Sequence, residues 1–378
     1  MKKINMVDLK SQYEKIKPEI DLAIQEVIDT TAYINGPSVK NFQQNLETYL
    51  GVKHVIPCGN GTDALQIAMM ALDLQPGDEV ITTTFTFIAT AEVIALLRLT
   101  PVCVDVDIDT MNISIEAIEK AITPKTKAIV PVHLFGQSAN MEAILALAKK
   151  HHLFVIEDAC QAIGADYYFS NGSTQKVGTM GDIGCTSFFP SKNLGCYGDG
   201  GAIFTNSDEL DYKIRGIVNH GMFTRYYHDL VGVNSRLDSI QAAILNVKLK
   251  SLDEYAKARN KAASYYNNAF ENHPSIIIPT TASYTSHVFH QYTLVTKNID
   301  RAKLIEFMNE KEIPVMIYYP VPMHKQKAYL DPRYKAGDFP VSEYLSDHVI
   351  SLPMHTELDE EQLSYITTSL LSFLNIKR

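Results

Sequence analysis

The residue that this chain offers most plainly for chemistry is a lysine set in front of a glycine cluster. Lys192 follows a β-like run, Ile183 to Phe189, and four glycines stand between it and Ala202. Glycine allows the backbone to approach a ligand closely and to adopt a positive φ, which a Cβ atom penalises. A lysine held in such a loop can bind a phosphate as a point charge or use its amine on a carbonyl group.

The order of these residues excludes one common phosphate-binding loop. In Gly-x4-Gly-Lys-[Ser/Thr] the glycines precede the lysine, whereas here they follow Lys192. The alternative is a surface lysine beside a flexible turn, and this stretch by itself favours neither interpretation. The decision depends on which other groups the fold brings to the loop.

A second candidate is the stretch Cys58-Gly59-Asn60-Gly61-Thr62-Asp63. It connects an expected strand, His54 to Pro57, to an expected helix, Ala64 to Leu74. A strand, a glycine-rich turn and a helix N-terminus form an anion site, because the first amides of a helix are free and its dipole favours negative charge. The stretch is not Gly-x-Gly-x-x-Gly, so it gives little support to dinucleotide binding. A plain turn between strand and helix is the alternative.

A carboxylate and an amide form the third candidate. Asp158 comes directly after the apolar strand Leu153 to Glu157, and Gln161 follows three residues later. An aspartate at the end of a strand either caps the next turn or acts as a buried partner for a cation, and capping is the commoner role for an isolated one.

Strands and helices alternate through the middle of the chain, which indicates βαβ units and a mostly parallel sheet. In such sheets ligands bind outside the carboxyl ends of the strands. The expected strands are 79–83, 101–106, 127–132, 153–157 and 202–205, and the expected helices between and after them are 86–97, 114–122, 140–150 and 208–218.

The pattern changes near the end of this alternation. Two helices are expected before it, Pro18 to Asp29, with Pro18 near the first turn, and Val39 to Leu50. After it come the helices Ser239 to Leu252 and Tyr255 to Glu271, and then a smaller α+β pattern. We therefore predict a large α/β domain over 1–252 and a small C-terminal α+β domain over 253–378.

Composition narrows the classes of function. The chain has 378 residues and a formal net charge of -9, which argues against a nucleic-acid-binding surface. Its longest apolar run, Phe87 to Leu97, contains Glu92 and is too short to cross a membrane, and the start does not read as a signal peptide. Five cysteines without Cys-x2-Cys spacing suggest neither a metal site nor a disulfide framework, so we expect a cytoplasmic protein.

Five blocks in order resemble the fold-type-I aminotransferases that use pyridoxal phosphate, specifically the sugar-nucleotide aminotransferases of the DegT/StrS type. The resemblance covers essentially the whole chain. Its blocks are Asn60-Gly61-Thr62-Asp63-Ala64-Leu65, Glu157-Asp158-Ala159-Cys160-Gln161-Ala162, Ser187-Phe188-Phe189-Pro190-Ser191-Lys192, Gly198-Asp199-Gly200-Gly201-Ala202 and Gly232-Val233-Asn234-Ser235-Arg236-Leu237-Asp238.

The resemblance implies roles for the three candidates. Lys192 would bond the cofactor aldehyde and then move the proton between Cα and C4′. Asp158 would pair with the pyridinium nitrogen and keep the ring an electron sink. Gln161 would hydrogen-bond the phenolic oxygen of the cofactor.

The resemblance also implies how the rest of the cofactor is held. Its phosphate would lie at the helix start formed by Gly61, Thr62 and Asp63, together with Ser187. Asn234 would reach that phosphate from the partner subunit, which implies a homodimer with shared active sites. Phe87 would stack on the pyridine ring, its alternative being a core aromatic of the helix.

The implied reaction moves an amino group from L-glutamate to the ketone of a nucleotide-linked sugar. Dehydratases of the same family carry histidine at the position of Lys192, so a 3-deoxygenating reaction is disfavoured. The loop most resembles enzymes acting on C3 of UDP-2-acetamido-2-deoxy-3-oxo-glucuronate, a sugar for surface polysaccharide such as lipopolysaccharide O-antigen. A dTDP-3-keto-6-deoxyhexose is the alternative acceptor.

Four residues are candidates for contacting the sugar nucleotide. Arg236 would meet the sugar carboxylate from the partner chain, although Asn-x-Arg also occurs in relatives that act on neutral sugars. Tyr318 and Tyr319 precede Pro320 where such relatives often read His-Tyr-Pro, which removes one possible cation. His324 is either a substrate contact or a structural histidine. Two further classes stay open, a regulator that binds the cofactor without turnover and an NAD-dependent dehydrogenase, which lacks its glycine fingerprint.

Overall fold

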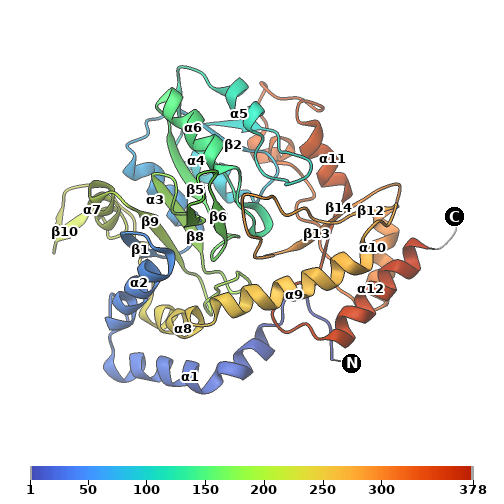
Figure 1. The fold of residues 1–378 in the computed structure, drawn as a ribbon. Coiled ribbons are helices and arrows are strands. Elements are labelled where there is room, and N and C mark those ends of the chain that lie inside the picture. The colour runs from blue at the N-terminus through green and yellow to red at the C-terminus, as the bar shows by residue number, and fades with distance from the viewer. Residues whose placement is uncertain (1, 376–378) are drawn as a thin grey trace.

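A seven-stranded sheet forms the centre of the first two-thirds of the chain (Figure 1). The computed structural model describes residues 2–375, so Met1 and residues 376–378, the outer ends of the two predicted domains, lie outside the described residues. Six strands run parallel, and β9 is antiparallel to both of its neighbours. The order across the sheet is β1 (His54–Cys58), β9 (Gly201–Thr205), β8 (Ile183–Ser187), β5 (Phe154–Asp158), β4 (Thr126–Val130), β2 (Glu79–Thr83) and β3 (Thr100–Val104).

Helices cover both faces of this sheet because successive side chains of its strands point to opposite faces. On β2, Val80 packs with the helices of one face and Ile81 with those of the other. The first face carries α3 (Gly61–Ala71), α4 (Ala89–Leu96) and α7 (Asp208–Ile217). The second carries α5 (Ile115–Ala121) and α6 (Met141–His151), and, over β1 and β9, α2 (Pro37–Leu50) and α8 (Ser239–Leu249).

A second core lies around the three-stranded antiparallel sheet of β12 (Ile276–Ile277), β13 (Tyr292–Thr296) and β14 (Val349–Leu352). Its helices are α9 (Leu252–Phe270), α10 (Arg301–Glu310) and α12 (Glu360–Leu374). Helix α11 (Pro340–His348) packs in another cluster, where Leu345 joins Phe85 and Val295. The N-terminal segment belongs to this core as well, since Ile4 is buried in it and the Met6 carbonyl accepts from the Met354 amide. The boundary at 252/253 stays a prediction.

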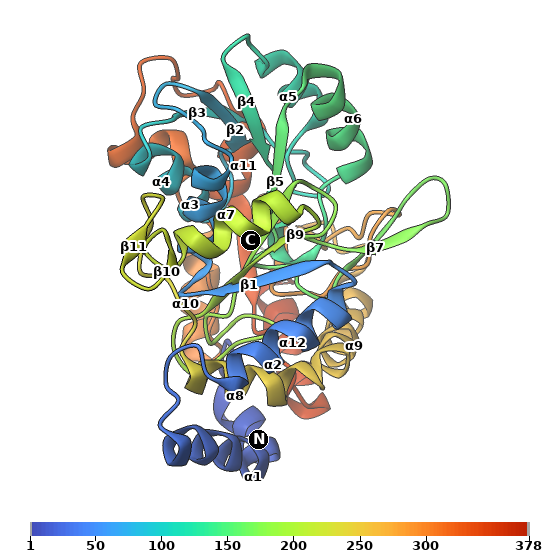
Figure 2. The ribbon, with the colours of Figure 1, turned by 90° about the vertical axis from the view of Figure 1, so that its left-hand side faces the viewer.

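The predicted alternation of strands and helices in the large sheet is confirmed. Some predicted helix bounds are wrong, and several short elements were not predicted. Helix α1 (Leu9–Thr30) begins well before Pro18, which lies inside it, because the Asp8 side chain accepts from the Ser11 amide and starts the helix there. The hairpin of β6 (Asp166–Tyr168) and β7 (Thr174–Lys176) was not expected and protrudes on the right of Figure 2. Neither were β14 and α11, nor the short hairpin of β10 (Met222–Thr224) and β11 (Tyr227–His228).

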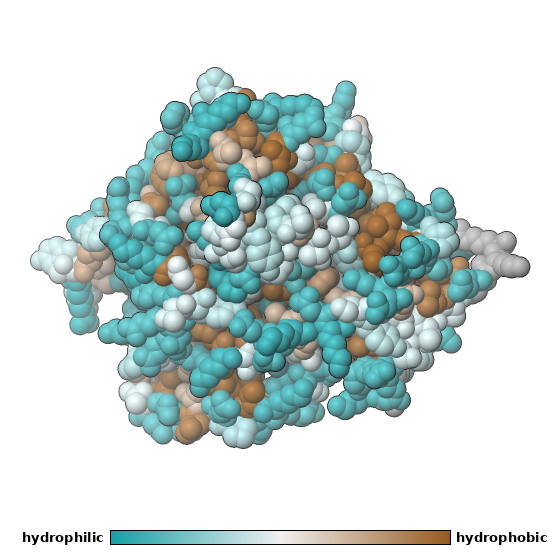
Figure 3. Space-filling model, viewed as in Figure 1, coloured by the Kyte–Doolittle hydropathy of each residue, from teal (hydrophilic) through white to brown (hydrophobic). Residues whose placement is uncertain are grey.

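The surface agrees with an ordinary globular composition. On the face drawn in Figure 3, hydrophilic side chains predominate and hydrophobic ones are broken into separate patches. Among residues 2–375, no helix combines the length and the apolar character that crossing a bilayer requires.

Candidate active site

Three of the predicted motifs lie at the carboxyl edge of the parallel strands. Asp158 ends β5 and Ser187 ends β8, and these two strands run parallel. Helix α3 follows the end of β1, which lies at the same edge because β1 and β8 are both antiparallel to β9. The topology therefore joins three motifs that are far apart in the sequence.

The N-terminus of α3 presents free amides. The Asn60 side chain caps the helix by accepting from the Asp63 amide at 2.8 Å, whereas the amides of Gly61 and Thr62 donate to no protein acceptor within residues 2–375. A Cβ atom on Gly61 would lie 2.7 Å from Ser187 Cβ, so only glycine fits this approach of helix to strand. The arrangement suits an anion such as a phosphate group.

Asp158 is a buried carboxylate held from two sides. Thr90 Oγ1, at the start of α4, donates to its Oδ2 at 2.8 Å, and the Cys160 amide donates to its Oδ1 at 3.2 Å. The residue is only 5% exposed. It therefore combines the two roles considered from the sequence, a cap of the following turn and a buried anion available to a cation.

Lys192 lies in a loop that is closed by a turn, in which the Lys192 amide donates to the Phe189 carbonyl. Its own amine makes no hydrogen bond or ion pair with any described residue. Burial lowers the pKa of this amine below its ordinary value, while Cys160 and Asp158 act in the opposite direction. A larger uncharged fraction makes the amine a better nucleophile and proton acceptor.

Gln161 connects two aromatic residues beside these groups. Its Oε1 accepts from the Phe135 amide at 2.9 Å, and its Nε2 donates to the Tyr319 hydroxyl at 3.0 Å. The Tyr319 ring stacks on Phe135 with centroids 6.4 Å apart and lies 6.3 Å from Phe87. Phe87 is 55% exposed and precedes α4, so it is not a core aromatic of that helix.

Asn234 and Arg236 contact one another and Asn219 in this chain. Arg236 donates from Nη2 to Asn234 Oδ1 at 2.8 Å and from Nη1 to Asn219 Oδ1 at 3.1 Å. Between them, Ser235 Oγ accepts from the Gly59 amide at 3.0 Å. Asn234 itself is exposed. The Arg236 Nε atom is buried and has no partner in the described part of the chain, so the guanidinium retains a free donor.

His324 favours the structural alternative. Its Nδ1 is hydrogen-bonded to Thr84 Oγ1 at 2.8 Å and its Nε2 to Glu343 Oε1 at 3.2 Å, so both ring nitrogens have protein partners. Tyr318 lies against the Tyr319 ring, with centroids 5.9 Å apart, and burial raises the pKa of its hydroxyl. For Tyr318 and Tyr319 a substrate contact stays a prediction.

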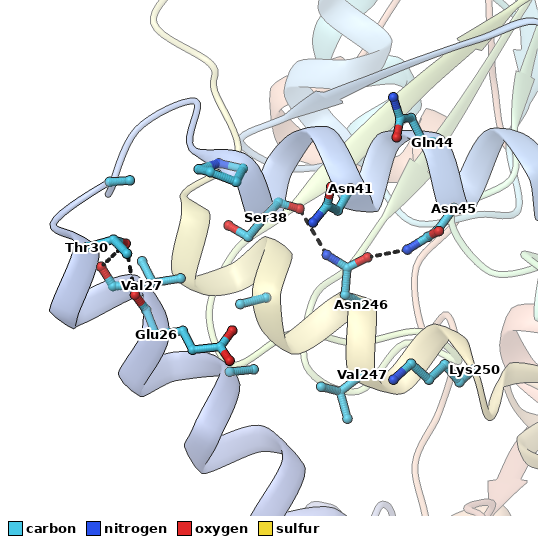
Figure 4. Close-up of a pocket in the computed structure, with 14 residues that line it drawn as sticks. Glu26, Val27, Thr30, Ser38, Asn41, Gln44, Asn45, Asn246, Val247 and Lys250 are labelled. Atoms are coloured by element: carbon cyan, nitrogen blue, oxygen red, sulfur yellow. Dashed lines mark hydrogen bonds between the residues drawn. The ribbon is translucent and has the colours of Figure 1, made fainter.

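A conspicuous groove lies elsewhere, between α1, α2 and α8 (Figure 4). Asn246 crosses it, donating to the Ser38 carbonyl and accepting from Asn45 Nδ2, both at 2.9 Å. None of the predicted site residues lines this groove. The candidate active site is identified by the chemistry of its residues.

Sequence reasoning missed several residues that hold this site together. Thr90 fixes Asp158, Phe135 fixes Gln161, and Asn193 and His290 contact one another beside Lys192. Only Asn193 carried a signal, its position next to the lysine.

The residues fit pyridoxal phosphate. The free amides at the start of α3 suit its phosphate. The amine of Lys192, whose pKa is lowered by burial, suits its aldehyde, and the buried carboxylate of Asp158 suits its ring nitrogen. On a mostly parallel sheet this combination defines a pyridoxal-phosphate-dependent aminotransferase of fold type I.

The chain belongs to the DegT/DnrJ/EryC1/StrS aminotransferase family, whose model matches residues 14–371. It is 47% identical over 372 residues to the "Pleiotropic regulatory protein" of Geobacillus stearothermophilus, covering 98% of both chains. It is 45% identical to the UDP-2-acetamido-2-deoxy-3-oxo-D-glucuronate aminotransferase of Pseudomonas aeruginosa, covering 97% of this chain and 99% of that one. It is also 45% identical to the UDP-N-acetyl-3-dehydro-alpha-D-glucosamine 3-aminotransferase of Acidithiobacillus ferrooxidans, covering 97% and 96%.

A solved structure confirms the predicted fold class. The X-ray crystal structure of S. venezuelae DesV in complex with a ketimine intermediate superposes with a TM-score of 0.95 at 36% identity, covering 100% of both chains. The sequence-based recognition of the family, of the α/β fold and of an aminotransferase that uses pyridoxal phosphate is thus confirmed.

Proposed function

We propose that this aminotransferase moves the amino group of L-glutamate to the C3 ketone of a UDP-linked 2-acetamido sugar, with UDP-2-acetamido-2-deoxy-3-oxo-glucuronate as the first candidate. The observation that carries the proposal is the free amine of Lys192, with its lowered pKa, beside Asp158 and the open amides of α3. The two 45%-identical relatives that act on 3-oxo UDP sugars support the acceptor class.

Pyridoxal phosphate, when bound, supplies an aldehyde that takes up amino groups and a ring that accepts an electron pair. In the proposal, the Lys192 amine would bond the cofactor aldehyde with loss of water, and would carry the proton to and from the substrate Cα. Asp158 holds the ring nitrogen in its charged form, while Thr90 keeps the carboxylate in place. Gly61 and Thr62 would bind the phosphate with their free amides, together with Ser187, whereas the Asp63 amide already donates to the Asn60 side chain.

The ring itself is proposed to lie between Gln161 and Phe87. Gln161 is oriented by the Phe135 amide, so its Nε2 faces the Tyr319 hydroxyl and can also reach a phenolic oxygen. The exposed Phe87 ring supplies an unoccupied face for stacking. Tyr318 and Tyr319 are proposed to border the sugar.

The proposal includes a homodimer in which Asn234 and Arg236 serve the partner's site. Within this chain Arg236 uses one N–H of Nη1 and one of Nη2, so further N–H donors of these nitrogens are left for a ligand, and a carboxylate is the group that a guanidinium binds best. We place the reaction in the cytoplasm, supported by five free cysteines, and in the synthesis of surface polysaccharide such as O-antigen.

Two alternatives are separated from this proposal by experiment. A 3-keto-6-deoxyhexose linked to dTDP would not need the charge of Arg236. A regulator that binds the cofactor without turnover is suggested by the printed name of the relative from Geobacillus stearothermophilus. The intact Lys192, Asp158 and Gln161 favour turnover.

The first experiment is an absorbance scan of the purified protein before and after L-glutamate. We expect a yellow band that glutamate removes and that a 3-keto UDP sugar restores. Lys192→Ala should lack the glutamate-sensitive band. A band that glutamate leaves unchanged supports the regulator, and absence of any band after added cofactor overturns the proposal.

The sugar is tested with Arg236→Leu. We expect the variant to lose turnover of the 3-oxo-glucuronate far more than turnover of a 3-keto sugar without a carboxylate. The matched control is Arg236→Lys, which keeps the charge and loses the fork. Equal losses on both sugars would remove the proposed role of Arg236 in selecting a carboxylate.

A further inference from the structure

The residue after Lys192 is anchored at both ends of its side chain. Asn193 is 5% exposed. Its Nδ2 donates to the Val288 carbonyl at 2.9 Å, and its Oδ1 accepts from His290 Nδ1 at 3.2 Å. Both partners lie in the segment that leads into β13. The side-chain amide of Asn193 therefore connects the loop of Lys192 to the segment that precedes β13 of the smaller sheet.

The hydrogen bond to Asn193 determines which ring nitrogen of His290 carries the hydrogen. Because Asn193 Oδ1 can only accept, Nδ1 of His290 must carry the hydrogen. Burial lowers the pKa of His290 well below its ordinary value, and the charges of Lys192 and Arg259 act in the same direction. His290 is consequently a neutral donor aimed at the loop of Lys192.

The backbone of His290 is held in turn by Arg259 of α9. This arginine is 3% exposed, and its Nη1 donates to the carbonyls of Phe289, His290 and Met354 at 3.0, 3.2 and 3.1 Å. No carboxylate pairs with it within residues 2–375. Burial lowers the pKa of Arg259 to about 10. A buried guanidinium that donates to carbonyl groups has a structural role, and here it fixes the segment before β13 that contains His290.

We propose that His290 is a positioning residue for Lys192 and acts through Asn193. It holds the loop so that the amine stays in its partly dehydrated place beside Asp158 and Cys160. The inference rests on the proposed role of Lys192 and adds the contact that enforces it.

The proposal predicts what happens when the contact is lost. Burial is what lowers the pKa of the Lys192 amine, so a looser and wetter loop raises that pKa toward the ordinary value of a lysine. The charged or titratable groups that face the amine are Asp158, Cys160 and His290. Since His290 is neutral, replacing it alters the position of the loop and not its charge.

Two substitutions divide the roles of the imidazole nitrogens. His290→Asn places an amide donor near the position of Nδ1, whereas His290→Gln places it near that of Nε2. In the cofactor-free protein, the pH dependence of Lys192 acylation by acetic anhydride, read by peptide mass spectrometry, gives the pKa of its amine. We expect His290→Gln to raise it and to slow labelling at neutral pH by about tenfold, since one pKa unit is a tenfold change in the uncharged fraction.

We expect His290→Asn to keep the pKa of Lys192 near that of the unchanged protein. His287 provides the matched control, because it is buried in the same segment and stacks on Phe289 with centroids 3.9 Å apart. His287→Gln disturbs this segment without removing the bond to Asn193. Asn193→Ala replaces His290→Gln if that variant does not fold, with the same expected rise.

Equal shifts in the asparagine and glutamine variants of His290, or a shift in His287→Gln as large as that in His290→Gln, would overturn the inference. Failure of the proposed function has a different signature. In that case the labelling shift is present, while the absorbance of added cofactor does not depend on Lys192. The two ideas are thereby tested separately.

Discussion

Replacing Gly61 with alanine tests whether the start of α3 is the cradle of the cofactor phosphate. The new Cβ would lie 2.7 Å from Ser187 Cβ and 2.9 Å from Cys160 Sγ, where ordinary contacts are 3.4–4 Å. The helix start must therefore move by about 0.5–1 Å, and overpacking of this kind costs about 1–3 kcal/mol. The higher helix propensity of alanine stabilises the folded protein by about 1 kcal/mol and offsets part of this cost.

The overpacking cost and the helix propensity predict different results for Gly61→Ala without and with bound cofactor. Without cofactor, α3 can shift, so the free energy of unfolding should fall by no more than about 2 kcal/mol. With cofactor, the amides of Gly61 and Thr62 must return to their places. The cost then appears in binding, and the dissociation constant for pyridoxal phosphate should rise by about 5- to 100-fold.

The assay is a spectroscopic titration of the cofactor-free protein with pyridoxal phosphate. Gly59→Ala is the matched control, because its Cβ would lie 3.1 Å from Ser235 Oγ and 3.2 Å from Asp63 Oδ2, both side-chain atoms that can move. We expect a clearly smaller loss of affinity for Gly59→Ala. Unchanged affinity in Gly61→Ala would refute the assignment of the phosphate to this helix start.

Three further substitutions have defined outcomes. Glu157→Gln should lower the free energy of unfolding in urea by about 3–5 kcal/mol, since this fully buried carboxylate accepts from His133 Nε2 and three backbone amides of residues 178–181. Thr90→Val should lower it by about 1–3 kcal/mol, because it removes a donor from the buried Asp158. Lys248 is buried, and burial lowers its pKa from 10.5 to about 8, so the unfolded chain holds more protons between these values and stability rises with pH across them. Urea titrations at several pH values should therefore show the native protein gaining up to about 3 kcal/mol relative to Lys248→Met between pH 8 and 10.5, and parallel curves would contradict it.

The order of strands and helices in the large sheet was predictable because local patterns carried it. The ends of helices were harder to predict, because they depend on capping contacts. Helix α3 begins at Gly61 and not at Ala64, because the Asn60 side chain accepts a hydrogen bond from the Asp63 amide in its first turn. Pro18 falsely indicates a helix start, since this exposed proline lies inside α1.

One missed element did have a signal in the sequence. The hairpin of β6 and β7 turns at Asn171-Gly172, and Gly172 has a φ of +84°. Asparagine followed by glycine between two short polar and aromatic runs is typical of such a turn. Strand β14 and α11 had weaker signals, because each is short and lies among prolines.

In the candidate site, too, some features could be predicted from the sequence and others could not. Lys192, Asp158 and Gln161 could be predicted because their motifs follow the order of a known family. The contacts that hold them could not, since they join residues with no local relation: Thr90 is 68 residues from Asp158, and Asn193 is 97 residues from His290. Only the folded chain brings such pairs together.

The burial of Ile4 in the core of β13, α10 and α12 has a consequence for how the molecule is made. A ribosome releases the N-terminal segment first, yet the groups that receive it, such as the Met354 amide, are synthesised near the end. The large sheet has all its strands by Thr205 and can begin to fold earlier. The segment around Ile4 must therefore wait, and the smaller core closes only after α12 has been synthesised.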